Sequence, residues 1–245
     1  MLGQFAVFAS IGLVTGFMSG MFGIGGGAIR IPIVFFAGVP LISAFGINLA
    51  VIPFSSLVGA FSHRKNIDYP IARNMIIGGS VGSVIGAYFA GLIPELTLAI
   101  IFVAAAILTV LGIYFDRIAP ELSRKIKPNT ANIILGAFLL NLITGIRGGS
   151  GGALFPPFLK IMHLDIFRSI ATSLFVTIFT ATAGIAIYWN RGNIPIMPGL
   201  AVLIGSMIGA RLGSRVSLRS KPFWLELGLS VLVVLLALFT VYRAL

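Results

Sequence analysis

Long apolar blocks are the feature that most constrains this chain. Blocks of about 18 to 22 residues recur along its 245 residues, and an α-helix of that length crosses a hydrocarbon core about 30 Å thick. Only 9% of the residues are charged, compared with roughly 25% in soluble domains. The pattern excludes a soluble fold and predicts an all-α polytopic membrane protein. Residues 3–22 lack a basic leader and a small-residue cleavage site, so we expect them to remain as a span.

The charged residues argue against a nucleic-acid partner. The net charge is +11, but the basic residues gather in short loops between apolar blocks, where membrane topology explains them. The chain has no cysteine, which excludes disulfides and thiolate metal sites. Its two histidines, His63 and His163, are far apart and have no nearby pair of carboxylates. We therefore expect no catalytic residue, no metal site and no cofactor.

The chain consists of two similar halves. A shift of about 125 residues superposes six positions of a glycine-rich motif on a second copy. The first copy contains Gly20, Gly23, Gly26, Gly27, Ala28 and Pro32, and the second contains Gly145, Gly148, Gly151, Gly152, Ala153 and Pro157. A shift of about 123 residues aligns residues 82–87 with residues 205–210. We infer a duplication, with a first membrane repeat at 1–116, a cytoplasmic linker at 117–128 and a second repeat at 129–245.

Each half is predicted to contain about four transmembrane helices and one short broken or re-entrant helix that follows a glycine-rich break. In the first half we predict a span at 3–22, a break at 23–27, a short piece at 28–38, and spans at 41–62, 71–92 and 95–115. In the second half we predict a span at 129–146, a break at 147–152, a short piece at 153–162, and spans at 166–188, 196–212 and 222–242.

Loop charge predicts that the two repeats are inverted, with both termini outside. The short pieces reach only about 16 Å as helices and cannot cross alone, so each half makes an odd number of net crossings. One face then receives His63, Arg64, Lys65, Arg73, Arg117, Arg124, Lys125, Lys127, Lys160, Arg168, Arg215, Arg219 and Lys221. The other keeps the N-terminus, the turn at 39–40, Glu95, Arg191 and Arg243. This asymmetry is the one expected when basic loops are cytoplasmic.

The two breaks are the candidate substrate-binding site. Irregular backbone at membrane depth must be buried in protein or line a wet cavity, and free amides at a half-helix N-terminus favour anions. The first break contributes Gly25, Gly26 and Gly27, and the second contributes Gly148, Gly149, Ser150, Gly151 and Gly152. Glycine leaves such amides open to a ligand.

Two arginines accompany the breaks, Arg30 and Arg147. A cation at bilayer depth is costly, so each is a candidate for binding an anion; the structural alternative is that it snorkels or caps helix carbonyls. All six acidic residues fall at predicted ends or loops, which favours an external anion as the counter-charge. Asn48 and the pair Thr172 and Ser173 occupy matching positions after each short piece. They could donate to an oxyanion or form interhelical contacts.

Residues 16–27, followed by Pro32, resemble the signature of the TauE/SafE sulfite exporter family, which includes toluene sulfonate uptake permease-like transporters. The resemblance extends over essentially the whole chain. It implies export or uptake of small sulfur-containing anions such as sulfite, thiosulfate, sulfoacetate or related sulfonates. The second break carries Arg147 where the first has Phe22, which suggests one anion held mainly by the second half.

We therefore expect a multi-pass protein of the cell membrane that acts as a secondary transporter of small sulfur-containing anions by alternating access. The same pattern fits an anion channel, whose amides would form a filter. Two alternatives belong to other classes. A membrane scaffold subunit would need neither buried arginines nor broken helices, and a membrane-embedded enzyme would need catalytic side chains that converge at membrane depth. The expected partners are the anion and the lipid bilayer. A proton or sodium ion as coupling ion, and a homo-oligomer, are both compatible with the sequence.

Overall fold

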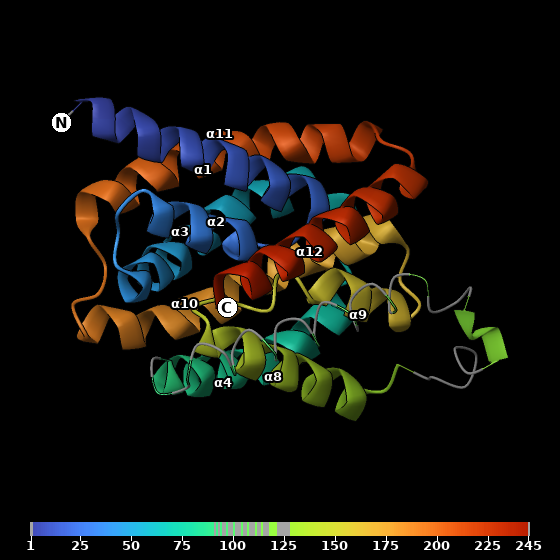
Figure 1. Cartoon of the computed structure of the whole chain (residues 1–245). Helices are drawn as coiled ribbons and strands as arrows, with labels where there is room; N and C mark the ends of the chain where they lie inside the picture. The colour runs from blue at the N-terminus through green and yellow to red at the C-terminus, as the bar shows by residue number, and fades with distance from the viewer. Residues whose placement is uncertain are drawn as a thin grey trace.

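The computed structural model describes residues 2–90 and 128–244, together with isolated positions between 92 and 121. In these parts the chain forms nine α-helices and one 3-10 turn, and no strand (Figure 1). The helices are α1 (Leu2–Phe22), α2 (Gly27–Phe36), α3 (Leu41–Ser62), α4 (Tyr69–Phe89), α8 (Thr130–Ile146), α9 (Phe155–Ile161), α10 (Ile166–Asn190), α11 (Ile196–Arg219) and α12 (Pro222–Ala244), with η1 at Arg64–Asn66. The prediction of an all-helical polytopic fold is confirmed for the described residues.

Four of the described helices are long and apolar enough to cross a membrane: α1, α3, α10 and α11. The predicted limits of α3 are confirmed at both ends, and both breaks interrupt the helices at the predicted positions. Helix α11 continues to Arg219, beyond the predicted end at residue 212. Arg215 and Arg219, which were expected in a loop, therefore belong to its last turns. Most of the predicted span at 95–115 and most of the linker at 117–128 lie outside the described residues.

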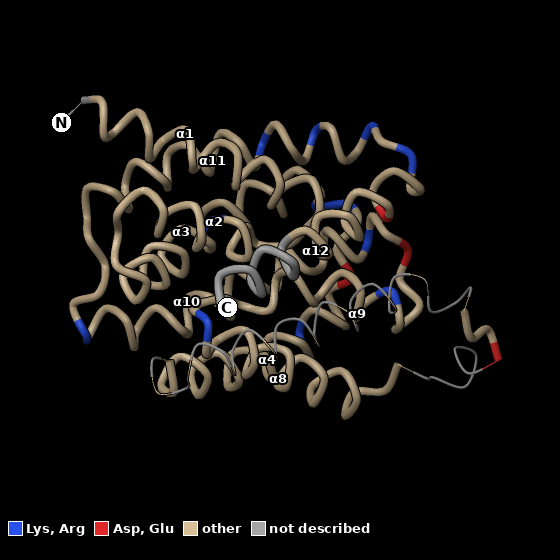
Figure 2. The backbone as a smooth tube through the Cα atoms, viewed as in Figure 1, with Lys and Arg blue, Asp and Glu red and all other residues tan. Residues whose placement is uncertain are grey.

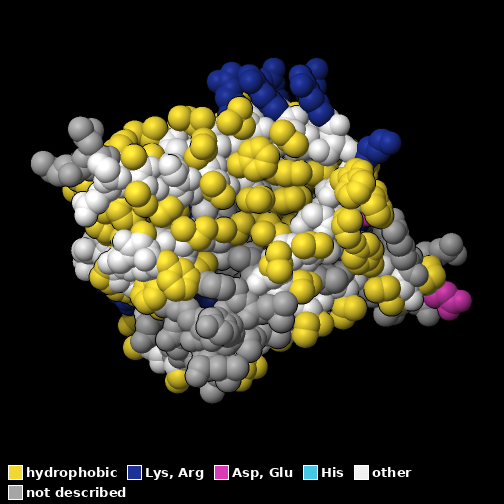
Figure 3. Space-filling view, turned by 45° about the horizontal axis from the view of Figure 1, so that its top comes forward, with side chains coloured by type: hydrophobic (Ala, Val, Ile, Leu, Met, Phe, Trp, Pro, Cys, Tyr) yellow, Lys and Arg dark blue, Asp and Glu magenta, His cyan; other side chains and the backbone are white. Residues whose placement is uncertain are grey.

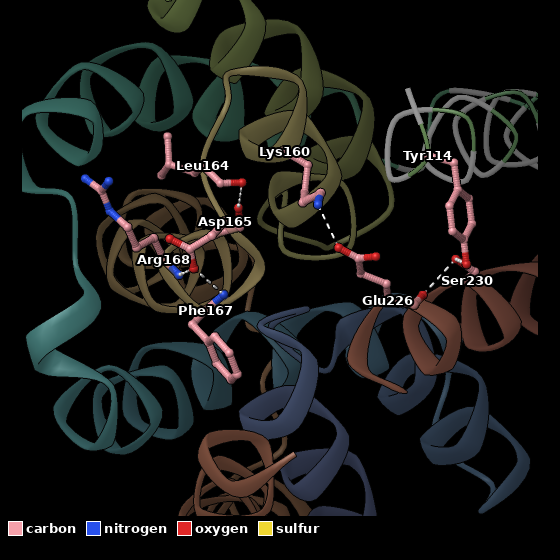
Figure 4. Close-up of polar contacts among 9 residues, drawn as sticks. Tyr114, Lys160, Leu164, Asp165, Phe167, Arg168, Glu226 and Ser230 are labelled. Carbon is pink, nitrogen blue, oxygen red and sulfur yellow. Dashed lines mark hydrogen bonds and ion pairs between the residues drawn. The ribbon is translucent and has the colours of Figure 1, made fainter. Parts of the chain in front are cut away.

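Side-chain caps fix the start of three helices. The carboxylate of Asp68 accepts a hydrogen bond from the backbone N–H of Ile71 at the start of α4, at 3.1 Å. The Asn129 side chain caps α8, and the Asp165 carboxylate accepts from two backbone N–H groups of α10 (Figure 4). Each cap satisfies N–H groups that have no partner inside the helix, so these starts follow from local sequence.

The first helix of each half packs against the fourth helix of the other half. Helix α1 lies along α11 and α4 lies along α8, and both contacts are lined by glycines. A Cβ atom placed on Gly16 would lie 2.2 Å from the carbonyl oxygen of Ser206, and one on Gly82 would lie 2.3 Å from that of Phe138. Such approach is possible only between small residues. The glycine stripes of these helices therefore allow both pairs to pack closely.

The order of the contacts gives the helix directions. Along α1 and α11, and along α4 and α8, residue numbers rise together, so each pair is parallel. The same holds for α3 with α11 and for α4 with α10. Helices α3 and α10 cross in the core and run antiparallel: Gly59 lies at Leu174, Gly184 lies at Leu49, and Thr177 donates to Ser56 between them at 3.0 Å.

The polarity of the interior and surface is reversed relative to a soluble protein. Large apolar side chains such as Phe61 and Leu57 are more than half exposed, whereas many serines and threonines are fully buried. Figure 3 shows the apolar side chains spread over the visible face, with basic side chains gathered along one edge. In Figure 2 most Lys and Arg lie toward the end of the bundle where α11 gives way to α12. A lipid environment explains this distribution.

Candidate functional site

The first break is a chain of glycines in a left-handed conformation between α1 and α2. Gly23, Gly25 and Gly26 have φ angles of 73°, 67° and 76°, which side chains with a Cβ rarely adopt. The chain therefore leaves α1 after Phe22 and re-enters a helix at Gly27. At the start of α2 the N–H groups of Ile29 and Arg30 donate to the Gly26 carbonyl, whereas those of Gly27 and Ala28 have no acceptor inside the helix. This turn lies in the interior of the bundle.

The second break repeats this geometry at two positions. Gly148 and Gly151 have φ angles of 64° and 70°, and they match Gly23 and Gly26 in the repeat. The backbone N–H groups of Leu154 and Phe155 both donate to the Gly151 carbonyl, as those of Ile29 and Arg30 do to the Gly26 carbonyl. The helix after this break is nevertheless shorter than predicted: α9 begins at Phe155, because Pro156 and Pro157 have no N–H to donate to the carbonyls four residues earlier. Both short helices therefore open with the same turn, and the two prolines delay the regular helix in the second half.

The two breaks touch each other in the middle of the protein. A Cβ atom on Gly152 would lie 2.3 Å from the Ile24 carbonyl oxygen and 2.9 Å from the Gly25 nitrogen. Each break is also held by a side chain from the opposite half. Asn48 Nδ2 on α3 donates to the Gly148 carbonyl at 2.7 Å, and Ser173 Oγ on α10 donates to the Gly23 carbonyl at 2.7 Å. The structure thus brings together residues about 100 or more positions apart in the sequence.

Arg30 is completely buried and bound by neutral oxygen atoms. Its Nη1 donates to Asn48 Oδ1 at 2.7 Å, its Nη2 to Ser206 Oγ at 3.2 Å and its Nε to Thr15 Oγ1 at 3.3 Å. Its side chain is 0% exposed, and among the described residues no carboxylate pairs with it. A buried cation held only by dipoles keeps a net positive charge at the centre of the protein.

The other predicted residues divide between the breaks and the bundle end. Arg147 caps the C-terminus of α8, and its side chain is partly buried. Ser150, Gly151 and Gly152 are buried at the contact between the breaks. Within the described part of the chain, Thr172 is hydrogen-bonded away from both breaks: its hydroxyl accepts from the backbone N–H of Asp68 at 3.0 Å, next to the Asp68–Arg168 ion pair.

Sequence reasoning missed two partners of Arg30 and one ion pair. Thr15 and Ser206 lie within small-residue stripes, which indicate packing as readily as binding. Lys160 on α9 and Glu226 on α12 form an ion pair at 2.7 Å, with side chains 16% and 10% exposed (Figure 4). The available sequence signal is Glu226, a carboxylate close to the start of the predicted apolar span at 222–242, where a helix end explains it equally well. The ion pair ties the short helix α9 to α12.

These features define a class: a polytopic helical membrane protein with two broken-helix motifs in contact at its centre. A sequence profile described as "Sulfite exporter TauE/SafE" matches residues 8–240. The chain therefore belongs to the TauE/SafE family, as its glycine motif indicated.

Curated relatives extend over nearly the same length. "Probable membrane transporter protein YdhB" of Bacillus subtilis is 28% identical over 213 residues, covering 84% of this chain and 85% of the relative. A "Probable membrane transporter protein" of Methanocaldococcus jannaschii is 29% identical over 252 residues, covering 94% and 92%. "Probable membrane transporter protein YunE" of Bacillus subtilis is 23% identical and covers 98% of both chains. No solved structure matches the chain.

Proposed function

We propose that this protein is a secondary transporter that carries small sulfur-containing anions, of the sulfite, thiosulfate and sulfonate class, across the cell membrane by alternating access. The family and the names of its relatives support membrane transport. The observation that carries the choice of an anion is Arg30, a buried guanidinium with no acidic partner among the described residues, beside two breaks that meet at the centre. The anion supplies the counter-charge that the protein does not.

The binding site in this proposal lies where the breaks meet. The N-terminal amides of α2 give N–H donors around a site that glycine leaves open. In the second break the N–H groups of Gly148, Gly149 and Gly151 already donate to the Gly145 carbonyl, the Thr144 carbonyl and the Thr144 hydroxyl, so this break contributes the N–H groups of Ser150 and Gly152. Arg30 and Arg147 supply positive charge on either side of the breaks. Asn48 and Ser173 hold the breaks in place through their carbonyls, so they position the site; Thr172 stabilises the end of the bundle. Small oxyanions fit such a site because they accept several hydrogen bonds in little space.

Alternating access requires that the two halves can adopt two arrangements around the substrate. The helix directions support the inverted repeats on which such a mechanism is commonly built. Helices α1 and α3 both run parallel to α11, and α8 and α10 both run parallel to α4, whereas α3 and α10 are antiparallel. The equivalent helices α1 and α8 therefore run in opposite directions, which supports inverted repeats with the substrate between them. The gathering of basic residues at one end of the bundle supports the orientation with that end in the cytoplasm and both termini outside.

The test is flux of radiolabelled sulfite, thiosulfate, sulfate and a small sulfonate in proteoliposomes, with and without imposed pH or sodium gradients. We expect saturable uptake of one sulfur oxyanion and counterflow, in which unlabelled anion inside accelerates entry of label. Non-saturating flux without counterflow would instead identify a channel. Arg30→Met should abolish flux, and Arg211→Gln, which removes an exposed arginine on α11, should retain it. Full flux in Arg30→Met would refute the proposed site.

A further inference from the structure

One exposed face of α11 changes from apolar to basic about halfway along the helix. In the first half of the helix its side chains are apolar and between 47% and 62% exposed, and they are Met197, Leu200, Ile204 and Ile208. In the second half the face continues with three exposed arginines, Arg211, Arg215 and Arg219. Steps of three and four residues keep side chains on one face of a helix, so all seven positions form a single stripe.

This stripe faces lipid. The opposite side of α11 packs on α1 through Gly205, Gly209 and Gly213, which leaves the stripe on the outside of the bundle. Large apolar side chains that are about half exposed on a membrane-spanning helix contact hydrocarbon. The arginines continue the same stripe, so they stand at the boundary between protein and lipid, rather than in a loop or in the interior. Figure 2 shows basic residues spaced along this part of α11.

The protein offers these arginines no counter-charge in the part of the chain that the structure describes. Helix α11 contains no acidic residue. The ion pairs between described residues use Lys160 and Arg168 as their cations, and none uses an arginine of α11. A cation that faces lipid is costly without an anion beside it, so the counter-charge must come from outside the chain.

The length of α11 places the arginines at the level of lipid phosphates. The helix begins at Ile196, directly after the loop that carries Arg191, so Met197 marks the opposite membrane boundary. At about 1.5 Å per residue, Arg215 lies about 27 Å and Arg219 about 33 Å from Met197, and the hydrocarbon core is about 30 Å thick. These two arginines therefore flank the boundary on the basic side, and Arg211, about 21 Å from Met197, can extend its side chain toward it.

Aromatic side chains mark the same level independently. Phe223 and Trp224 follow α11 at the start of α12, and they are 52% and 60% exposed. Trp and other amphipathic aromatic side chains are typical of the layer where lipid headgroups begin. Leu212 and Val216, which are 45% and 41% exposed beside the arginines, add apolar surface for acyl chains at this level.

We propose that Arg211, Arg215 and Arg219 bind the headgroup of an anionic phospholipid in the leaflet at the basic end of the bundle. A guanidinium binds a phosphate through two parallel hydrogen bonds, and the lipid's acyl chains continue along the apolar half of the stripe. A zwitterionic lipid fits less well because its own ammonium group offsets the phosphate charge. The site lies on the outside of α11, away from the breaks, so it does not depend on which anion is carried.

A second copy of the chain is a poorer occupant of this face. In a two-fold dimer the same patch meets itself, and parallel copies of α11 would bring both sets of arginines together. Juxtaposed like charges oppose association. An anionic lipid neutralises the same charges and covers the same apolar surface.

Lipid binding can be measured without transport. The purified full-length protein in a neutral detergent is mixed with equal amounts of dioleoyl phosphatidylglycerol and dioleoyl phosphatidylcholine, and the lipids bound to the intact protein are identified by native mass spectrometry. We expect phosphatidylglycerol to be retained in preference. Arg215→Gln/Arg219→Gln should weaken its binding about 30-fold, because each basic residue near an anionic lipid surface contributes about fivefold in affinity. An excess of inorganic phosphate, which has no acyl chains, should not displace it.

The matched control is Arg64→Gln/Lys65→Gln, which removes two exposed basic residues from the loop after α3, at the same end of the bundle. It should keep the preference. Equal retention of both lipids, an unchanged preference in Arg215→Gln/Arg219→Gln, or an equal loss in the control would overturn the proposal. Displacement by inorganic phosphate, or a stable dimer that binds no lipid, would do so as well. If Arg215→Gln/Arg219→Gln does not fold, Arg219→Gln alone decides, with about a fivefold loss expected.

Discussion

Adding one methyl group at Gly152 should separate the two breaks. The new Cβ would lie 2.3 Å from the Ile24 carbonyl oxygen, 2.6 Å from the Ile24 carbonyl carbon and 2.9 Å from the Gly25 nitrogen. Ordinary contacts of a Cβ begin at 3.4 Å, so the breaks must move apart by about 1 Å. All three neighbours are backbone atoms, which cannot rotate away as a side chain could. Gly152 is not among the residues with positive φ, so alanine introduces no backbone strain and the effect is steric.

We expect Gly152→Ala to lose about 1–3 kcal/mol of stability through overpacking, which lowers Tm by several degrees in a chain of this size. Transport should fall further, on the order of 100-fold, because a displacement of about 1 Å disrupts a site built to hold a small ligand. The assays are thermal unfolding in detergent and initial rates of anion flux in proteoliposomes.

Gly199→Ala on α11 is the matched control, because its Cβ would meet only Ile47 Cγ1, at 4.0 Å. It should leave both Tm and flux unchanged. If Gly152→Ala behaved like this control in both assays, the breaks could not be in contact, and the reasoning that places the site between them would be wrong.

Three further perturbations test other parts of the structure. Arg30→Met should keep Tm within a few degrees while abolishing anion binding, because it removes a buried charge whose desolvation is costly; a large loss of stability with binding intact would contradict this. Burial lowers the pKa of His63 from its ordinary value to about 4, so stability present above pH 6.5 should be lost as pH falls toward 4, by about 3 kcal/mol in full. His63→Gln should flatten this part of the profile of Tm against pH. An unchanged profile would show that protonation of His63 does not cause the loss of stability. Lys160→Met and Glu226→Gln should each destabilise the protein, but the double variant should lose about 1–3 kcal/mol less than their sum; additive losses would mean that the pair has no energetic coupling.

The sequence predicted helix positions well where local chemistry decides them. Helix α3 begins after Pro40 and ends at Ser62, where the polar loop begins, and both limits were readable from the apolar block and its flanks. Both glycine breaks were found because the conformation needs glycine at matching positions. Helix α9 was predicted too long, although Pro156 and Pro157, which have no N–H to donate, are a sequence signal for its late start.

The site could be predicted only in part, because its contacts cross between the halves. The arginines and glycines were legible, since charge and flexibility are unusual at membrane depth. Thr15 and Ser206 were not, because a small polar residue on a packed helix face looks the same whether or not it binds a cation. Helix α1 packs on α11 of the other repeat, and α4 packs on α8. The 3.6-residue period of a helix shows which face is apolar but does not show which helix of the other repeat will cover it.

If the proposed function holds, the divergence of the two halves explains how a nearly symmetric scaffold can bind one anion. Arg30 corresponds to Phe155, and Phe22 corresponds to Arg147, so each half has one arginine and one phenylalanine in exchanged places. Arg30 reaches the other half through Asn48, which accepts from Arg30 and donates to the Gly148 carbonyl, both at 2.7 Å. Through Asn48, the arginine of the first half is thus connected by hydrogen bonds to the break of the second half. In the proposed site a strictly symmetric pair would hold two equal sites, whereas this exchange puts one arginine next to each break, and movement of either half would then change the environment of the same anion.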